Sequence, residues 1–362
     1  MEAIVEACDY HGPYPGNFIP SLLAVGDAVR LRLGLEYVPV FPAQVCGRPW
    51  VDLVRSRGYE PHFIPAGGDV RTHARALHDI AASARAKLIR SHFTRFDIAA
   101  GIGARRIGAR SIWNIHSGLL EYTPMRRLSD VMKVRLLGRV LCDRLIAVSD
   151  EIARELRIRG HPAPKVSVVL NGIDVSRFND LPARAEARAA LGLGPEERVA
   201  LAFCWTPFRK GADLIAAACA REGSIALLVG GDELANFLDP MPNNVRIIPP
   251  ADDPRVLFAA SDVFVSASRE EGLPYAIGEA MAARLPIASS RIPGPAPYFD
   301  APGLETFDNE DVDGLATVLD NLLDPVRRPE RGEANRMFVE QRLGLDRHVE
   351  RVLEIFECEL GR

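Results

Sequence analysis

The chain lacks the segments that would place it across a membrane or send it out of the cell. It has no run of about eighteen uncharged apolar residues, so no stretch is long enough for a spanning helix. Residues 1–16 contain acidic residues where a secretory signal needs basic ones, and no long apolar stretch follows them. We therefore expect a cytoplasmic protein.

Other absences narrow the chemistry. The six cysteines are scattered and form no C-x-x-C pair, the spacing that a metal site or a redox motif would need. We interpret them as reduced thiols that mostly serve packing. No G-x-G-x-x-G follows the first expected strand, which argues against a nicotinamide-dependent dehydrogenase. Short repeats and low-complexity tracts are absent as well.

What is present is a globular composition with an uneven distribution of charge. Hydrophobic residues make up 48% and charged residues 25% of the 362 residues, a length suited to two domains. Residues 1–175 carry 24 Lys and Arg against 17 Asp and Glu, whereas the remainder carries 20 against 31. A basic half and an acidic half indicate two domains with different partners, although chance and mutual attraction between the domains would explain the same pattern.

Short apolar runs alternate with amphipathic helical patterns along the whole chain. This alternation predicts an α/β fold with parallel sheets that are covered on both faces. The pattern restarts after the turn sequence LNGIDVSRFND at residues 170–180, so two successive doubly wound units fit better than one large sheet. The expected strands are residues 3–7, 37–41, 62–66, 88–93, 111–116, 144–149 and 166–170, followed by 198–205, 224–231, 244–250, 263–268 and 285–290.

The stretch REEGLPYAIGEAMA, residues 269–282, places two carboxylates eight positions apart around a turn. We expect a helix from about Pro274 to Ala283, because proline is favoured in the first turn of a helix. Glu271 thus precedes a helix N-terminus, where free amides bind anions or sugar hydroxyls. Glu279 lies about one and a half turns into the helix. A capping acid followed by an ordinary helix glutamate is the alternative interpretation.

This stretch, continued as EGLPYAIGEAMAARLPI, closely resembles the donor-site motif of retaining family 4 glycosyltransferases, the glycosyl transferases group 1. CDRLIAVSDEIARELRIRGHPAPKVSVVLNGIDVSRF, residues 142–178, is similar to the family's closing strand, helix and interdomain linker. LLVGGDEL, NNVRIIPPADD and VLFAASDVFVSASREEG continue the pattern in order. The resemblance implies the GT-B fold of two facing Rossmann-like domains with a C-terminal helix that crosses back, and a bacterial enzyme.

The resemblance also implies roles at the donor site. The first glutamate, Glu271, would contact hydroxyls of the donor sugar, and the second, Glu279, would bind the ribose of the nucleotide. Gly272, Leu273 and Pro274 would lie at the helix start beside the donor diphosphate and sugar.

A cation pair in PFRKGADLI, residues 207–215, suits the diphosphate of such a donor. Arginine can form a forked contact and lysine acts as a point charge, and both can stabilise a departing diphosphate. The family pattern carries Lys-Gly here, so Lys210 transfers directly. The family arginine expected about six positions earlier is replaced by Cys204 and Trp205, and Arg209 could take over its role. A solvated basic loop is the alternative.

Four further residues match positions of the family less specifically. His116 ends an expected strand and resembles the histidine that contacts the donor sugar, and His92 is placed similarly one strand earlier. Gly16 lies in a glycine-containing loop ahead of a helix expected near Ile19, close to the diphosphate in the family. Backbone groups near Ile248 would face the base. Structural histidines and an ordinary Pro/Gly turn would explain the same residues.

The resemblance implies transfer of a sugar from a nucleoside diphosphate sugar to a glycan, a lipid-linked or a small-molecule acceptor, with the anomeric configuration retained. Front-face attack would require neither a metal nor another cofactor. A hydrolysing nucleotide-sugar epimerase shares this architecture, but no second carboxylate is placed as its general acid or base. The replaced arginine at Cys204 leaves a non-catalytic relative that binds nucleotide sugar as a further alternative.

We expect an acceptor-side domain over residues 1–170, a donor-binding domain over 171–340, and a C-terminal helix over 341–362 that packs back on the first domain. The basic residues of the first domain suit a phosphorylated acceptor or an anionic membrane surface, which would make the protein peripheral to the inner face of a membrane. An arginine-rich solvated face is the alternative, and no nucleic acid partner is expected. The basic residues are Arg105, Arg106, Arg110, Arg126, Arg127, Lys133 and Arg135.

Overall fold

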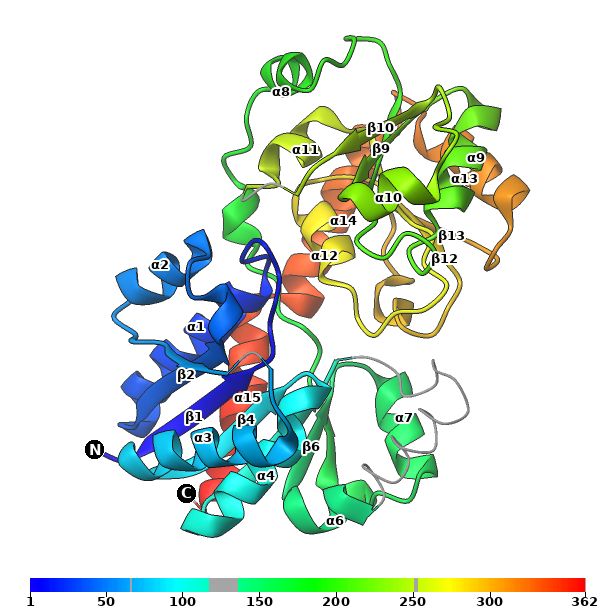
Figure 1. Cartoon of the computed structure of the whole chain (residues 1–362). Helices are drawn as coiled ribbons and strands as arrows, with labels where there is room; N and C mark the ends of the chain where they lie inside the picture. Colours follow the sequence, from blue (N-terminus) through cyan, green and yellow to red (C-terminus); the bar gives the residue numbers. More distant parts are fainter. Residues whose placement is uncertain (66, 117–135, 251–252, 362) are drawn as a thin grey trace. The chain divides into compact units, whose positions relative to one another are not determined.

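The computed structural model describes residues 1–65, 67–116, 136–250 and 253–361, and the chain forms two compact units (Figure 1). The first unit consists of Met1–Gly172 together with Leu345–Arg362, and the second of Ile173–Gly344. These divisions fall after residues 172 and 344, whereas the sequence places the domain boundaries after 170 and 340.

The first unit is built on a seven-stranded sheet in which every neighbouring pair is parallel. The strand order is β3-β2-β1-β4-β5-β6-β7, so the direction of winding reverses between β1 and β4. The strands are β1 Ala3–Cys8, β2 Glu36–Pro42, β3 His62–Ile64, β4 Ala86–His92, β5 Arg110–Ile115, β6 Arg144–Ala147 and β7 Val166–Val168. The α-helices are α1 Phe18–Ala28, α2 Pro49–Ser56, α3 Val70–Ser83, α4 Thr94–Ile107, α6 Gly138–Leu141, α7 Asp150–Ile158 and α15 Leu345–Leu360.

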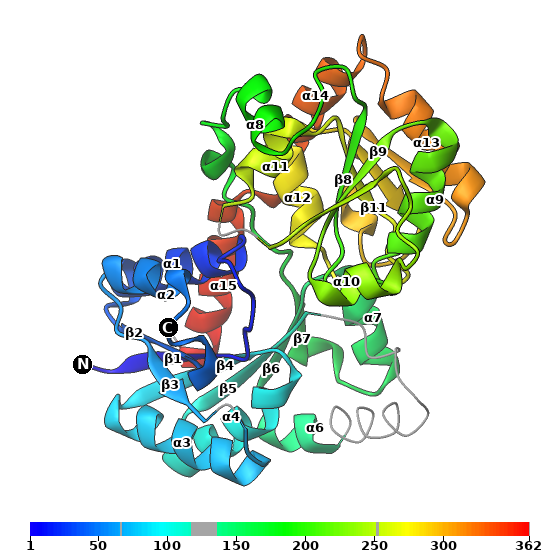
Figure 2. The same ribbon diagram turned by 45° about the horizontal axis from the view of Figure 1, so that its top comes forward.

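Alternation of side chains along the central strands separates an apolar face from a partly polar one. Val5, Ala7 and Ile89 pack in one buried cluster with residues of α3 and α4. Because successive side chains of a strand point to opposite faces, Glu6 and Arg90 lie on the other face of the sheet. Figure 2 shows α3 and α4 on one side of this sheet and α1 and α15 on the other.

Helix α15 returns to the first unit and contacts α1. Its His348 Nδ1 lies 2.8 Å from the carbonyl oxygen of Leu170. Gly172 is required beside it, because a Cβ at this position would lie 2.6 Å from the His348 Cβ. Helix α15 therefore packs so closely against residue 172 that no side chain fits at that position.

The second unit repeats the winding with a six-stranded parallel sheet of order β10-β9-β8-β11-β12-β13. Its reversal lies between β8 and β11. The strands are β8 Val199–Phe203, β9 Ile225–Val229, β10 Val245–Ile248, β11 Val263–Ser266, β12 Ile287–Ser290 and β13 Leu304–Phe307. The α-helices are α8 Arg184–Ala190, α9 Ala212–Glu222, α10 Asp232–Phe237, α11 Arg255–Ala260, α12 Tyr275–Ala282, α13 Val312–Leu322 and α14 Arg328–Leu343.

The predicted fold class, two doubly wound parallel α/β units, is confirmed, and each expected strand overlaps a strand of the structure. One strand was missed, the edge strand β13, because its sequence LETF offers no continuous apolar run. All six cysteines are free thiols, and four of them are buried. Within the described residues, no helix has both the length and the apolar character needed to cross a bilayer.

Candidate functional site

Each sheet has one place where the winding reverses, and polar side chains gather at the carboxyl ends of the strands there. Ligands of doubly wound sheets bind outside these ends, since the loops from the two central strands diverge and leave a crevice. In the first unit the strands are β1 and β4, and in the second they are β8 and β11.

Lys210 and Glu271 form the centre of the cluster in the second unit. Lys210 lies in the loop after β8, and its Nζ forms an ion pair with Glu271 Oε1 in the loop after β11. Ser268 Oγ donates to the same carboxylate oxygen at 2.9 Å. The side chains of Lys210 and Glu271 are 17% and 9% exposed, so solvent screens this pair only in part.

The loop after β8 is held against the loop after β11 by close backbone contacts. Gly211 has a φ of +67°, and a Cβ there would lie 2.1 Å from the carbonyl oxygen of Ala267, so only glycine fits. The amide of Arg269 donates to the carbonyl oxygen of Arg209 at 2.8 Å. Arg209 Nε is buried and has no hydrogen-bond partner within the described residues. The loop therefore brings Arg209 and Lys210 to the same strand ends.

The turn before α12 is equally constrained. Gly272, Leu273 and Pro274 are buried, and Pro274 is the N-cap, so α12 begins one residue later than expected. A Cβ at Gly294 would lie 2.3 Å from the carbonyl oxygens of both Glu271 and Gly272, which shows how closely a second loop presses on the turn. The turn sequence Gly-Leu-Pro is thus positioned by the backbone of that loop.

The remaining predicted residues of the second unit lie on two different elements. Glu279 is 3% exposed and occupies the middle of α12. Ile248 ends β10, and its carbonyl oxygen already accepts a hydrogen bond from the amide of Gly230 at 3.0 Å. One of the two lone pairs of this oxygen is therefore already used within the protein.

In the first unit, the sheet brings His92 and His116 together. His92 ends β4 and His116 directly follows β5, and His92 Nδ1 lies 2.8 Å from His116 Nε2. His92 Nε2 contacts Glu6 Oε1, which lies on β1. Asn114 Nδ2 approaches His116 Nε2 to 3.1 Å, and Arg90 donates to Asn114 Oδ1 at 2.7 Å.

Aromatic rings enclose this pair of histidines. Phe93 has a φ of +64°, a strained conformation for a residue with a side chain, and its ring stacks on His116 at a centroid distance of 4.5 Å. The ring of Phe18 contacts both imidazoles edge-on. Phe18 is the first residue of α1, which begins one residue earlier than expected, and Gly16 precedes it with a φ of +51°.

Burial dominates the electrostatics of the cluster. It raises the pKa of Glu6 to about 7, although the Arg90 guanidinium opposes this rise. Burial holds the pKa of His92 and of His116 well below the usual range; the positive charge of Arg90 adds to this effect at His92, and both His92 and Arg90 add to it at His116. Both imidazoles are consequently neutral near neutral pH, and each carries one ring hydrogen.

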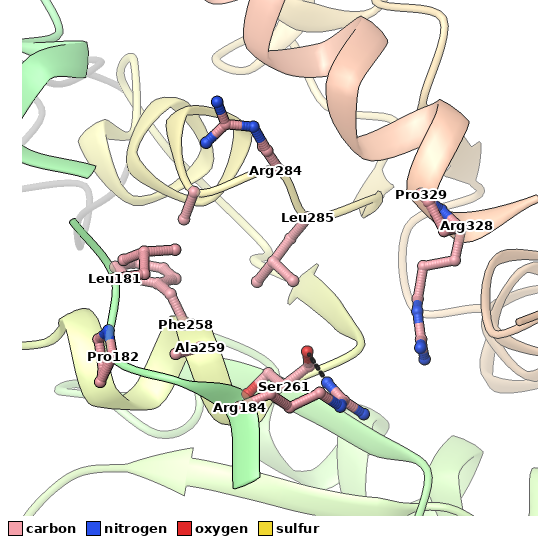
Figure 3. A pocket seen from close by; sticks show the side chains of 11 residues that line it. Leu181, Pro182, Arg184, Phe258, Ala259, Ser261, Arg284, Leu285, Arg328 and Pro329 are labelled. Atoms are coloured by element: carbon pink, nitrogen blue, oxygen red, sulfur yellow. Dashed lines mark hydrogen bonds between the residues drawn. The ribbon is translucent and has the colours of Figure 1, made fainter. Parts of the chain in front are cut away.

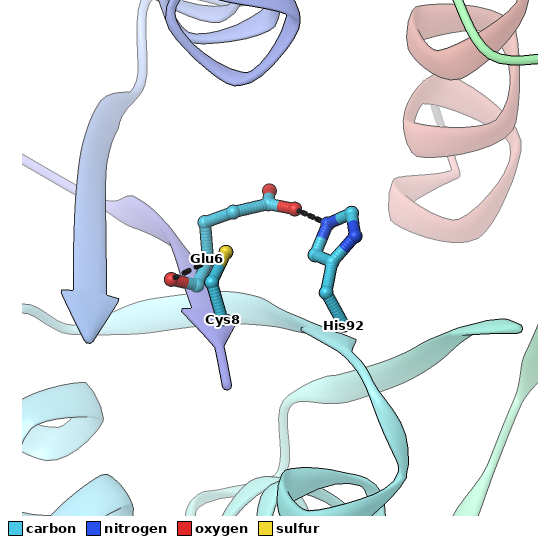
Figure 4. Close-up of side chains that lie close together, drawn as sticks. All are labelled: Glu6, Cys8 and His92. Carbon is cyan, nitrogen blue, oxygen red and sulfur yellow. Dashed lines mark hydrogen bonds and ion pairs between the residues drawn. The ribbon is translucent and has the colours of Figure 1, made fainter. Parts of the chain in front are cut away.

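Glu6, Cys8 and His92 lie close enough together to be considered as metal ligands (Figure 4). Their chemistry does not fit that role. Glu6 Oε1 and His92 Nε2 are hydrogen-bonded to each other. The Cys8 Sγ contacts the main-chain oxygen of Glu6 at 3.9 Å. Burial and the charge of Glu6 raise the pKa of the Cys8 thiol, whereas a metal binds the thiolate. We therefore assign these groups to a hydrogen-bonded cluster.

Sequence reasoning missed several members of both clusters. Glu6, Arg90 and Asn114 lie inside strands that read as apolar runs, and Ser268 follows β11. Glu6 and Arg90 could have been found as charged residues inside otherwise apolar strands. Charged groups stay buried only when they are paired, so each such residue indicates a partner nearby.

A hollow of about 230 Å³ lies at the opposite edge of the second sheet (Figure 3). Ser261 and Leu285, which line it, precede β11 and β12, so it is remote from the carboxyl ends of these strands. Arg184 and Arg328 also line it, and both contact the buried carboxylate of Asp262. Since these arginines already serve a structural carboxylate, we do not assign the hollow to ligand binding.

Some of the basic residues expected to form a patch on the first unit make ion pairs within the protein. Arg105 and Arg110 each contact Asp143 Oδ1 at 3.2 Å, and Arg106 is exposed. Arg126, Arg127, Lys133 and Arg135 lie outside the described residues.

Two doubly wound sheets, each with a polar cluster at its reversal point, define a two-domain α/β protein of the class in which ligands bind at strand ends. Residues 26–177 match Glycosyltransferase Family 4, and residues 202–325 match Glycosyl transferases group 1. The chain belongs to this family of glycosyltransferases, as its sequence resemblance indicated.

Among curated proteins, the chain is similar to the D-inositol 3-phosphate glycosyltransferases of Mycobacterium marinum and Mycobacterium bovis. The first is 30% identical over 198 residues, which cover 50% of this chain and 42% of the relative. The second is 28% identical over 197 residues, covering 50% and 41%. The matches thus span less than half the length of these relatives.

Solved structures show the same fold over the whole chain. A glycosyltransferase from Rickettsia africae superposes with a TM-score of 0.81 at 15% identity, covering 99% of this chain and 98% of that one. Anabaena HepE in complex with UDP-glucose gives a TM-score of 0.82 at 16% identity, covering 99% and 100%. The fold is therefore GT-B.

Proposed function

We propose that the protein transfers a sugar from a nucleoside diphosphate sugar to an acceptor and retains the anomeric configuration. The observation that carries this proposal is the cluster of the second unit. There Lys210 and Glu271 form an ion pair beside the start of a helix, and Arg209 precedes Lys210 in the same loop, with an Nε that is buried and has no hydrogen-bond partner among the described residues. Such a set of donors and charges suits a diphosphate with a sugar attached.

Each residue of the second unit has one role in this proposal. Lys210 and Arg209 bind the diphosphate, and Glu271 binds hydroxyls of the donor sugar next to Gly272, Leu273 and Pro274. Glu279 binds the ribose, and backbone groups near Ile248 face the base. For the first unit, the family resemblance assigns His116 to the donor sugar and Gly16 to the loop beside the diphosphate.

In the proposed reaction an acceptor oxygen bonds to the anomeric carbon on the face from which the diphosphate leaves. The bond between that carbon and the phosphate oxygen breaks, and the leaving phosphate takes the acceptor proton. Glu271 is engaged by Lys210 and Ser268, which suits a group that positions the sugar rather than one that forms a covalent bond. Lys210 and Arg209 supply the positive charge for the leaving group, so the proposal includes no metal.

The relatives suggest which ligands to test first. Anabaena HepE was solved with UDP-glucose, and the curated relatives act on D-inositol 3-phosphate by name. We therefore propose a UDP-sugar as the first donor to test and a phosphorylated small molecule as the first acceptor. The excess of basic residues in the first half of the sequence suits an anionic acceptor.

A thermal-shift panel of UDP, GDP, ADP and their sugars tests the donor, because a ligand that binds only the folded state raises the melting temperature. The binding nucleotide should stabilise the wild type and Glu271→Ala but not Glu279→Ala. Transfer, measured as release of the nucleoside diphosphate in the presence of EDTA, should be lost in Glu271→Ala. Glu333→Gln, which changes an exposed surface acid of the same unit, is the control. Full turnover of Glu271→Ala, or loss of turnover with EDTA alone, contradicts the proposal.

A further inference from the structure

The hydrogen bonds around His116 form one continuous chain whose direction can be worked out. It begins at Arg90, which can only donate, and Arg90 donates to Asn114 Oδ1 at 2.7 Å. The amide nitrogen of Asn114 therefore faces His116 Nε2, at 3.1 Å. A neutral ring nitrogen that receives a hydrogen bond carries no hydrogen, so the ring hydrogen of His116 lies on Nδ1.

The same argument extends inward to Glu6. Since His116 Nε2 accepts, His92 Nδ1 must donate to it across their 2.8 Å contact. The other nitrogen, His92 Nε2, is then bare and can only accept. Its partner is Glu6 Oε1, so Glu6 must carry the hydrogen and be a carboxylic acid (Figure 4). Glu6 is fully buried, and that burial raises its pKa to about 7, which is consistent with a protonated carboxyl below neutral pH.

The outer end of the chain is the second ring nitrogen of His116. His116 is partly exposed, and among the described residues its hydrogen-bond contacts are made by Nε2, whereas none is made by Nδ1. The rings of Phe93 and Phe18 hold the imidazole from two sides. His116 therefore presents a single N–H donor at the strand ends of the first unit.

We propose that Glu6, His92 and His116 form a proton relay in which the ionisation of the buried Glu6 decides whether His116 Nδ1 faces the donor sugar as a hydrogen-bond donor or as an acceptor. Glu6 and His92 are positioning residues, because they act on the ligand only through His116. The relay rests on the proposed function in that the ligand of His116 is taken to be the donor sugar.

The relay step balances in protons and charge. His116 Nδ1 gives its proton to a base outside the protein or on the ligand. The proton on His92 Nδ1 passes to His116 Nε2, and the proton of the Glu6 carboxyl passes to His92 Nε2. Both imidazoles end neutral with their hydrogens on the opposite nitrogens, and the negative charge remains on Glu6. The new hydrogen on His116 Nε2 then faces the Asn114 amide, so the anionic form loses that hydrogen bond.

The side chains around Glu6 determine the pH at which Glu6 ionises and the relay switches. Besides His92, the titratable or charged side chains that face Glu6 are Arg90 on β4, Tyr37 on β2, His348 on α15 and Cys8 on its own strand. The Arg90 Nε lies 3.5 Å from Glu6 Oε1, the oxygen that also contacts His92. Burial favours the acid and has the largest effect on the pKa of Glu6, whereas Arg90, the Tyr37 hydroxyl and His348 favour the carboxylate. Glutamine at residue 6 would retain an N–H donor toward His92 at every pH and would so keep His116 in the donor form.

The test uses the full chain labelled with ¹⁵N-histidine, and the chemical shifts of the two His116 ring nitrogens report which one carries the hydrogen. In the wild type the hydrogen should move from Nδ1 to Nε2 as the pH rises through the ionisation of Glu6. In Glu6→Gln it should stay on Nδ1 throughout. Glu333→Gln, the surface control of the nucleotide panel, should behave like the wild type. A His116 hydrogen on Nε2 at low pH in the wild type overturns the proposal, whether or not Glu6→Gln folds.

Transfer activity supplies the second readout. Using the donor found in the nucleotide panel, kcat/KM of the wild type should fall about tenfold per pH unit above the ionisation of Glu6, whereas Glu6→Gln should lose this fall. A purely structural role of Glu6 would lower activity at all pH values and leave the profile unchanged, which refutes the relay. If no donor supports transfer, the proposed function fails, and the position of the His116 hydrogen still decides the relay.

Discussion

Replacing Glu271 with glutamine should tighten the binding of the free nucleoside diphosphate while it removes sugar transfer. The carboxylate of Glu271 is paired with Lys210, the cation that we assign to the diphosphate. An incoming diphosphate must therefore share this lysine with Glu271 and also approach its negative charge. Glutamine keeps the size of the side chain and can still accept from Ser268 Oγ, but it carries no charge.

The size of the effect follows from the burial of the pair. Two unit charges about 4 Å apart interact by about 4 kcal/mol at an effective dielectric constant of about 20. Lys210 is 17% exposed, and a bound phosphate would lie farther from Glu271 than Lys210 does, so only part of this energy is recovered. We expect a gain of about 1–2 kcal/mol, which corresponds to about 5- to 30-fold tighter binding.

Isothermal titration of the wild type, Glu271→Gln and the surface control Glu333→Gln with the nucleoside diphosphate measures this directly. The gain in affinity should shrink as salt is added, because it is electrostatic. Turnover of the complete donor should fall at least about 100-fold, since a contact to the sugar is lost. Weaker binding of the nucleoside diphosphate by Glu271→Gln would refute the competition between Glu271 and the phosphates for Lys210.

Three further predictions concern stability. Gly211→Ala should lower the unfolding free energy by about 2–4 kcal/mol in urea denaturation, because it combines a positive φ with a clash against Ala267. Asp262→Asn should lower the unfolding free energy by about 3–5 kcal/mol, because three arginines share this buried carboxylate. An unchanged urea midpoint would show that the arginines need no anion. Glu6 has a folded-state pKa of about 7 against an ordinary value of 4.5, so its contribution to stability is present below pH 4.5 and is lost as the pH rises to 7. Glu6→Gln should therefore gain about 3 kcal/mol relative to the wild type across this range, measured as the difference between their urea midpoints at several pH values.

Local patterns in the sequence were enough to find most elements and one of the two polar clusters. Period-two alternation and short apolar runs identify strands because a buried strand needs apolar residues on its faces. Arg209, Lys210 and Glu271 stand a few residues after such runs, in loops at the carboxyl ends of parallel strands. Because these ends lie at one edge of a sheet, the three residues could be expected on the same edge. The edge strand β13 was not predicted, because two of the four residues in LETF are polar.

The sequence by itself determined the two doubly wound units and the strand ends at which polar residues collect, because these depend on local periodicity and turn chemistry. Only the tertiary structure decided which side chains meet there. Glu6 and His92 are 86 positions apart and Lys210 and Glu271 are 61 apart, so their pairing depends on strand order and register, which no local pattern encodes. The direction of the hydrogen bonds from Arg90 to Glu6 is also a tertiary property, since each donor is assigned by the partner that the neighbouring strand brings to it.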